Sequence, residues 1–368
     1  MDTSAVEIEF DADGNCQFCN DFLSRTKDLK KVTEAEKSVT LENFIKKIKA
    51  EGKGKAYDCI VGLSGGLDSS WVLVQAVKQG LRPLAVHMDN GWNSELAQNN
   101  IECLINKLGV DLFTYVIDWE EYRDLQEAFF KADVVDIELL YDNALAAVNY
   151  KLAAKYSLKY ILSGSNTATE GVRMPKEWAA LNKFDFQNIK NIWKKFGKGY
   201  NLKTFPGYGF ENHIIDYYFR KVRWVPFLDY FDYTKKEALA VLTKEYGFVP
   251  YPYKHYESVF TRFYQAYILP QKFGFDKRRN HLSALILTDQ LSREEALKIL
   301  VDRPYATEED QNTDIEYVLK KFSWTPEYLE EYLKRPMIKH EVYGGEIFKW
   351  DMKRNLSLFV TKLSKIFK

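Results

Sequence analysis

The alternation of apolar and polar positions predicts an α/β core in the first half of the chain. Apolar runs at 57–63, 84–88, 112–117 and 160–162 are short and bounded by polar or turn-forming residues, as buried strands are. Between them, segments 69–79 and 95–108 have helical periodicity and end at Gly80 and Gly109, and 121–157 is a long helical tract. Strands that alternate with helices favour right-handed crossovers and therefore a parallel, Rossmann-like sheet.

The regions on either side of this core differ from it in composition and in the pattern of apolar residues. Residues 1–25 are polar and turn-rich and contain a Cys-x-x-Cys pair, which predicts a small Cys knuckle, and residues 26–54 predict a connecting helix. Residues 55–172 carry the α/β rhythm, whereas residues 173–368 are mainly helical and rich in aromatic side chains. We expect this last region to pack over the carboxyl edge of the sheet and to bind the substrate.

Composition and charge exclude several classes of protein. The chain has 368 residues, of which 46% are hydrophobic and 15% aromatic, so it can bury a full core. Lys plus Arg equals Asp plus Glu at 52 each, which disfavours a nucleic-acid binder. A run of 18 apolar residues is absent from the sequence, and so is a basic stretch followed by an apolar one at its start. We therefore expect a cytoplasmic protein without a membrane span.

The turn after the first predicted strand has the features of a phosphate-binding loop. Strand 57–63 runs through Ser64-Gly65-Gly66-Leu67-Asp68-Ser69-Ser70 directly into a helix. This geometry points backbone N–H groups and the positive end of a helix dipole at an anion, and two glycines let the backbone approach phosphate oxygens. We assign phosphate binding to Ser64, Gly65, Gly66, Ser69 and Ser70.

Two other motifs overlap this loop. A kinase-type P-loop would need a Lys after its second glycine, and none follows here, so transfer of a γ phosphate is disfavoured. Gly62-Leu63-Ser64-Gly65-Gly66 also fits Gly-x-Ser-x-Gly, the nucleophile elbow of α/β-hydrolases. In that fold several strands precede the serine, whereas here a Cys pair and a charged helix precede it. This order of elements disfavours a hydrolase.

The stretch Ser-Gly-Gly-x-Asp-Ser-Ser resembles the PP-loop of ATP pyrophosphatases, which cleave ATP between its α and β phosphates. The resemblance implies a PP-loop ATP-binding domain at 55–172, with Asp68 associated with Mg²⁺. Because the carboxyl ends of parallel strands meet at one edge, the residues after the second and fourth strands should face the same ATP. These candidates are His87, Asp89, Ser163, Gly164 and Asn166, with Glu170 further along.

A second polar cluster lies in the helical region. It comprises Lys254-His255-Tyr256-Glu257-Ser258, then Arg262, and then Asp276-Lys277-Arg278-Arg279-Asn280-His281. Its local excess of basic residues suits a phosphorylated ligand such as a sugar nucleotide. With Asp89-Asn90-Gly91-Trp92-Asn93-Ser94, these stretches make nearly the whole chain similar to the N-acetyl sugar amidotransferases of surface-polysaccharide and nonulosonic-acid pathways. We assign anchoring of the sugar nucleotide to Lys254, His255, Arg262, Lys277, Arg278, Arg279 and His281.

This resemblance implies a reaction and its partners. ATP would adenylate the acetamido oxygen of a nucleotide-linked N-acetyl sugar, and ammonia would then displace AMP to leave an acetamidino group. Asp68, Glu170 and Lys254 are the candidate catalytic residues, and Glu257 is a further candidate for a general base. The sequence shows no evident glutaminase nucleophile, so we expect a glutaminase subunit to supply ammonia, together with a synthase-like barrel subunit.

The four cysteines suggest one metal site. Cys16 and Cys19 supply two of the four ligands that a structural Zn²⁺ needs, and members of the family that this chain resembles carry an earlier Cys pair before an Asp-Thr-Ser-like stretch. Because the chain opens with Met1-Asp2-Thr3-Ser4, we expect a late start that removes that pair. Cys59 and Cys103 are expected to be buried as small hydrophobic residues.

Two alternative functions stay open at this point. One is a tRNA-thiolating enzyme with the same loop, which would need more cysteines and a basic RNA-binding surface. The other is a non-catalytic nucleotide-binding subunit.

Overall fold

The computed structural model describes residues 1–27, 33–180, 182–199, 201–251 and 256–355. Its centre is a five-stranded sheet in the order β3-β2-β1-β4-β5, and all four strand pairings are parallel. The strands are β1 (Cys59–Gly62), β2 (Pro83–Asp89), β3 (Leu112–Val116), β4 (Tyr160–Ser163) and β5 (Arg223–Pro226). The order reverses between β1 and β4, which is the position where open α/β sheets bind their ligands. The predicted parallel, Rossmann-like sheet is confirmed.

Helices cover both faces of the sheet, and the side chains of β1 show how. Cys59 and Val61 point into one core, which contains residues of α2 (Glu34–Glu51), α3 (Leu67–Lys78), α4 (Glu95–Leu108) and α10 (Lys235–Tyr246). Ile60 points into the opposite core, which contains residues of α5 (Trp119–Lys131), α6 (Leu139–Lys155) and α8 (Phe186–Phe196). The central strands are buried on both faces, which explains why they read as continuous apolar runs.

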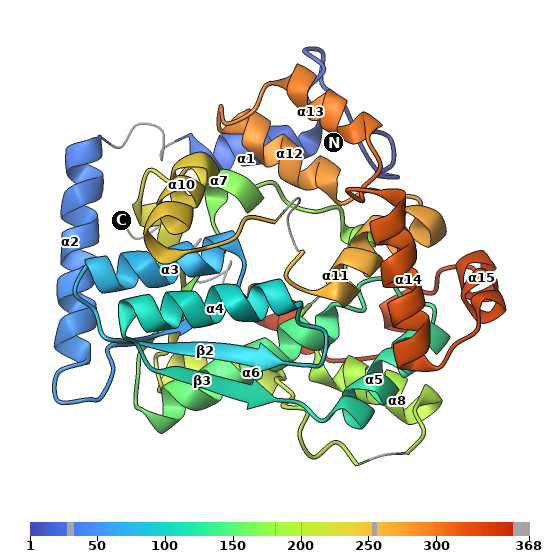
Figure 1. Cartoon of the computed structure of the whole chain (residues 1–368), viewed down its shortest axis with the longest axis horizontal. Helices are drawn as coiled ribbons and strands as arrows, with labels where there is room; N and C mark the ends of the chain where they lie inside the picture. The colour runs from blue at the N-terminus through green and yellow to red at the C-terminus, as the bar shows by residue number, and fades with distance from the viewer. Residues whose placement is uncertain (28–32, 181, 200, 252–255, 356–368) are drawn as a thin grey trace.

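The second half of the chain is mainly helical, as predicted. Residues 259–263 and 308–334 lie at the carboxyl ends of β2 and β3 (Figure 1), whereas α8 and α10 cover the faces of the sheet. Its elements are α9 (Phe210–Ile214), η3 (Ile215–Phe219), η4 (Phe227–Tyr230), α11 (Val259–Phe263), η5 (Tyr264–Phe273), α12 (Arg278–Leu287), α13 (Arg293–Val301), α14 (Glu308–Phe322), α15 (Pro326–Lys334) and η6 (His340–Tyr343). In this region α12 packs against the short helix α7 (Thr167–Glu170), which follows β4. The remaining elements are α1 (Gln17–Thr26) and η2 (Lys176–Trp178). None of the helices in the described ranges is long and apolar enough to cross a membrane.

Three details differ from the predicted elements. The tract 121–157 forms two helices instead of one, because the chain turns at Asp133 and Asp136, whose φ angles are 53° and 63°. Aspartate tolerates this left-handed conformation, and both carboxylates accept hydrogen bonds from distant segments. The structure also adds β5, which is too short for its alternation to stand out. Finally, Cys59 is buried as expected, but Cys103 is exposed on α4.

Candidate active site

The Ser64–Ser70 turn forms a compact loop between β1 and α3. Ser69 Oγ accepts a hydrogen bond from the Ser64 amide at 3.2 Å, and the Ser64 and Ser69 hydroxyl oxygens lie 3.1 Å apart. Ser64 Oγ also accepts from the Gly66 amide at 3.2 Å. Within the described chain, the N-terminus of α3 has no side-chain cap, so its first amides are available to an anion. The loop therefore has the construction of a phosphate cradle.

Close backbone packing explains why glycines are needed here. Gly65 has a φ of +83°, and a Cβ on it would lie 2.8 Å from the carbonyl oxygen of Ala97. A Cβ on Gly164, which follows β4, would lie 2.9 Å from the Ser69 amide nitrogen. The turns after β1 and β4 therefore touch through their backbones, and a side chain at either glycine would displace the amides of the loop.

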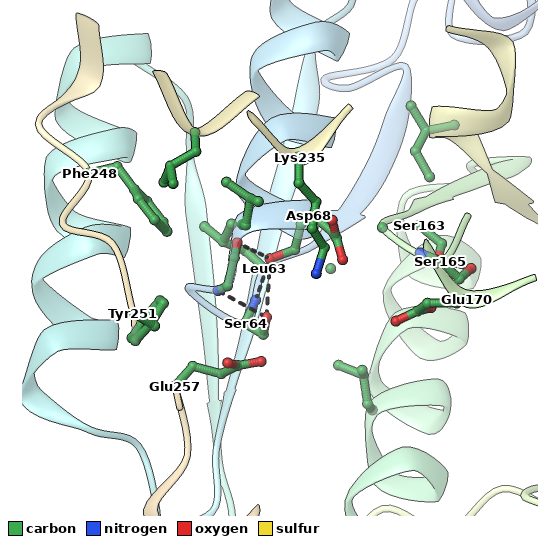
Figure 2. Close-up of a pocket in the computed structure, with 18 of the residues that line it drawn as sticks. Leu63, Ser64, Asp68, Ser163, Ser165, Glu170, Lys235, Phe248, Tyr251 and Glu257 are labelled. Carbon is green, nitrogen blue, oxygen red and sulfur yellow. Dashed lines mark hydrogen bonds between the residues drawn. The ribbon is translucent and has the colours of Figure 1, made fainter. Parts of the chain in front are cut away.

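The first cavity, with a volume of about 600 Å³, opens beside this loop. Ser64, Gly66, Asp68, Ser69, Ser163 and Gly164 line one part of it, and Lys235 and Lys236 of α10 add positive charge. In Figure 2, Lys235 lies beside Asp68 and the apolar side chains of Phe248 and Tyr251 form the opposite wall. The volume is within the range of nucleotide and cofactor sites. The cavity thus combines a phosphate-binding end with an apolar wall.

A second cavity of about 560 Å³ adjoins the first. Four residues, Ser64, Tyr141, Glu170 and Glu257, line both cavities. The other walls of the second cavity carry paired charges, since Lys277 lies 2.9 Å from Glu138 and Lys183 pairs with Asp142. This set of paired donors and acceptors suits the part of a ligand that carries hydroxyl or amide groups.

Asp68 and Glu170 are suited to hold Mg²⁺. Both carboxylates line the first cavity, and Asp68 accepts a hydrogen bond from the Tyr233 hydroxyl. Burial, followed by the Asp68 carboxylate, raises the pKa of Tyr233, and the charge of Glu170 acts in the same direction. The Tyr233 hydroxyl therefore stays protonated and orients Asp68. Mg²⁺ bound to phosphates commonly takes one or two protein carboxylates, and these residues fit that pattern.

Several predicted ATP-binding residues support the loops but do not line either cavity. The buried ring of His87 lies 2.9 Å from the Leu63 carbonyl and 3.0 Å from the Asn93 amide, and its burial lowers its pKa. Asp89 accepts from the Gly91 amide at 2.8 Å. Asn166 caps the N-terminus of α7. Ser70 is buried in α3, and its hydroxyl has no hydrogen-bond partner among the described residues. These four side chains thus support the loops around the site, and their contact with ATP stays a prediction.

The basic cluster is divided by the structure. Lys277 and His281 line the second cavity, whereas Lys254 and His255 lie outside the described residues. Arg262 forms an ion pair with Asp314, Arg278 pairs with Asp276 at 2.7 Å, and Arg279 pairs with Asp2 at 2.5 Å. The three arginines do not line either cavity, and each forms a contact with another part of the fold. The structure thus places these three side chains outside both cavities, and their role as anchors of the sugar nucleotide stays a prediction.

The Cys pair does not make a zinc site in the described structure. The sulfur atoms of Cys16 and Cys19 lie 3.4 Å apart at the start of α1. The described residues contain no group of three or more His, Cys, Asp or Glu side chains that could hold a metal ion. The four ligands of a structural Zn²⁺ are thus not assembled here.

The structure brings in residues that the sequence motifs did not indicate. Lys235 and Lys236 reach the first cavity from the start of α10, and Tyr141 reaches both cavities from α6. Tyr233, just before α10, donates a hydrogen bond to Asp68, which lines the first cavity. Lys183 reaches the second cavity from the segment before α8. Each lies in a stretch with ordinary helical or loop composition, so the sequence offered no signal beyond the two adjacent lysines.

The parallel sheet and the loop after β1 resemble those of the PP-loop ATP pyrophosphatases. Residues 38–201 match the family model described as NAD synthase, and residues 257–357 match the model described as LPS biosynthesis protein WbpG-like, C-terminal domain. The two matches confirm the resemblance to PP-loop enzymes and to proteins of lipopolysaccharide biosynthesis. They imply an enzyme that uses ATP and Mg²⁺.

Solved structures of two synthetases are similar to this chain at low identity. An NH3-dependent NAD synthetase from Campylobacter jejuni, in complex with the nitrate ion, is 18% identical, with a TM-score of 0.30 over 46% of this chain and 74% of that chain. An NMN synthetase from Francisella tularensis is 17% identical, with a TM-score of 0.29 over 60% of this chain and 98% of that chain. No curated protein has significant similarity to the chain.

Proposed function

We propose that the protein is an ATP-dependent amidotransferase that converts the acetamido group of a nucleotide-linked N-acetyl sugar into an acetamidino group. The observation that carries the proposal is the pair of cavities that meet at Ser64 of the phosphate loop. An enzyme that joins ATP to a second substrate needs two adjoining sites of this kind. The match of residues 257–357 to a lipopolysaccharide-biosynthesis family supports a sugar as the second substrate.

The first cavity takes ATP. The adenine would lie against the apolar wall that includes Phe248, and the phosphates would lie at the uncapped N-terminus of α3 near Ser69. Lys235 and Lys236 supply the positive charge that the loop itself lacks. Mg²⁺, when bound by Asp68, neutralises charge on the phosphates.

The second cavity takes the acetamido sugar. The paired side chains of Lys277 with Glu138 and of Lys183 with Asp142 present donors and acceptors to hydroxyl and amide groups. Because the cavities share the wall at Ser64, the acetamido group can face the α phosphate of ATP. Holding the two reacting groups in this orientation is the main contribution of the protein to the first step.

The reaction then has two steps. The acetamido oxygen forms a bond to the α phosphorus while the bond between the α phosphorus and the bridging oxygen breaks, which releases pyrophosphate. Ammonia next adds to the imidate carbon, and the carbon–oxygen bond breaks with loss of AMP. Adenylation is needed because an amide oxygen is a poor leaving group, whereas AMP is a good one. A partner glutaminase, with a synthase-like barrel subunit, is proposed as the source of ammonia.

The test is a coupled assay of AMP and product. The protein is incubated with ATP, Mg²⁺, ammonium and a panel of UDP- and CMP-linked acetamido sugars, and the products are analysed by mass spectrometry. We expect acceptor-dependent AMP and a sugar nucleotide that is lighter by the difference between an oxygen atom and an NH group. AMP formation that depends on tRNA would favour the thiolating alternative, and ATP binding without turnover would favour the non-catalytic one.

A further inference from the structure

Two carboxylates, Glu170 and Glu257, line both cavities, and their surroundings differ. Glu170 ends α7 on the β4 side of the site, and its charge acts on Tyr233 together with that of Asp68. Glu257 belongs to the segment before α11, on the other side of the phosphate loop, and its charge acts on Tyr141 and Tyr251. The two acids therefore face different parts of the site, and Glu170 acts on the same tyrosine as Asp68 does.

The Glu257 carboxylate lies directly against the phosphate loop. A Cβ on Gly66 would lie 3.1 Å from Glu257 Oε1, so the absence of a side chain at residue 66 leaves room for this carboxylate. Figure 2 shows the carboxylate pointing towards Ser64 at the base of the loop. Glu257 is thus close to the place where an acceptor in the second cavity would meet the α phosphate.

The backbone around Glu257 is held in a defined position. Its carbonyl accepts from the Ser94 amide at 2.9 Å, and the Val259 amide donates to the Trp92 carbonyl at 2.9 Å. Between these two bonds, Asn93 and Ser258 form an antiparallel bridge. The backbone of this segment is therefore fixed to the loop that follows β2, which limits the positions that the Glu257 side chain can take.

A carboxylate at this position has a chemical consequence for each step of the proposed reaction. Next to the phosphates of ATP its negative charge is unfavourable, so it does not assist ATP binding by itself. In the second step, however, neutral ammonia adds to carbon and its nitrogen becomes positively charged. The product amidinium is also a cation, and its planar N–H groups match a carboxylate in the way a guanidinium does.

We infer that Glu257 is the catalytic residue of the ammonia step, where it accepts a proton from the attacking nitrogen and pairs with the amidinium product. This inference rests on the proposed function. As the nitrogen lone pair forms the new bond to carbon, one N–H proton passes to the Glu257 carboxylate. The carbon–oxygen bond then breaks, its electron pair leaves with AMP, and the proton returns to the sugar-bound nitrogen. One ammonia and one adenylated imidate thus give one amidinium and one AMP.

The family matches show to which part of the chain Glu257 belongs. The NAD-synthase match covers the ATP-binding loop and ends at residue 201, while the WbpG-like match begins at residue 257. Glu257 is thus contributed by the part of the chain that resembles lipopolysaccharide-biosynthesis proteins.

The experiment measures the two steps separately in Glu257→Gln, which keeps the size of the side chain and removes its charge. Acceptor-dependent exchange of labelled pyrophosphate into ATP, without ammonia, reports the first step. Amidino product with saturating ammonium reports the second. The acceptor is the UDP- or CMP-linked acetamido sugar that gives AMP with the parental protein. We expect exchange within a few-fold of the parental rate and product formation lowered about 10²-fold or more.

Glu95→Gln is the matched control, because Glu95 is an exposed carboxylate in the first turn of α4, beside the loop that holds Glu257. It should leave both rates unchanged, and Glu257→Asp should recover part of the product formation. Product formation by Glu257→Gln at the parental rate would overturn the inference. A parallel loss of exchange would also overturn it, since Glu257 would then act in ATP binding or adenylation. If the parental protein shows neither exchange nor product with any acceptor, it is the proposed function that fails.

Discussion

Replacement of Gly164 by Ala tests whether the turns after β1 and β4 form one rigid phosphate site. The added methyl group would lie 2.9 Å from the Ser69 amide nitrogen and 3.1 Å from the carbonyl carbon of Asp68. Real Cβ atoms do not approach backbone atoms this closely, so the two turns must separate. Overpacking of this kind costs about 1–3 kcal/mol of folding free energy. The shift also moves an amide that is positioned to bind phosphate.

The effect on ATP follows from the hydrogen bonds at risk. A hydrogen bond to a charged group contributes about 1.5–3 kcal/mol, so losing one weakens binding by about tenfold or more. Calorimetric titration with ATP and Mg²⁺ measures this affinity, and urea unfolding measures the stability. We expect Gly164→Ala to lower both the ATP affinity and the urea midpoint.

Gly62 provides the matched control on the same cavity. A Cβ at Gly62 would lie 3.7 Å from the Asn149 side chain, which is an ordinary contact, so Gly62→Ala should be neutral or stabilise the protein by up to about 1 kcal/mol. If the two alanine variants bind ATP equally and unfold at the same urea concentration, the two turns do not restrain each other and the reasoning is wrong.

Three further predictions concern single residues. Asp68→Asn should lower AMP formation at least about 10²-fold in the coupled assay. Tyr233→Phe should lower it less, because the Asp68 carboxylate remains but loses the hydroxyl that orients it. Unchanged rates in both variants would contradict a role of Asp68 in binding Mg²⁺. Arg262→Ala leaves the buried Asp314 without its cation and should lower the free energy of unfolding, measured with urea, by about 3–5 kcal/mol. A loss of activity with the parental stability would contradict this structural role of Arg262. Burial, followed by the charge of Lys353, lowers the pKa of His213 from 6.5 to about 4. The unfolded chain therefore binds a proton first as the pH falls, so the stability due to His213 should be fully present above pH 6.5 and be lost down to about pH 4. His213→Phe should flatten that part of the curve, and an identical loss in both proteins would count against it.

Local signals were sufficient to predict the nucleotide half of the molecule. The loop at Ser64–Ser70, the four strands and the end of α4 at Gly109 all depend on residues that are close in sequence. The parallel sheet follows from their alternation. Gly164 was predicted to face the same site as the loop, and the structure brings its backbone into contact with Ser69.

Long-range contacts decided what the sequence could not predict. An arginine such as Arg262 looks the same in sequence whether it meets a ligand or Asp314, and the choice depends on a helix about fifty residues away. Tyr233 reaches Asp68 from a separation of 165 residues. Strand β5 has four residues and ends in a proline, so its place at the sheet depends on pairing with β4 rather than on its own pattern.

The path of the chain between β4 and β5 has an implication for how such enzymes diversify. After Ser163 the backbone leaves the sheet for about sixty residues, contributes Arg173, Met174 and Lys183 to the second cavity, and returns at Arg223 to pair with the strand it left. This segment is held at both ends by strands that pair with each other, β4 and β5. Under the proposed function, replacement of these cavity-lining side chains would change the choice of acceptor, whereas the phosphate loop and the pairing of β4 with β5 would stay the same.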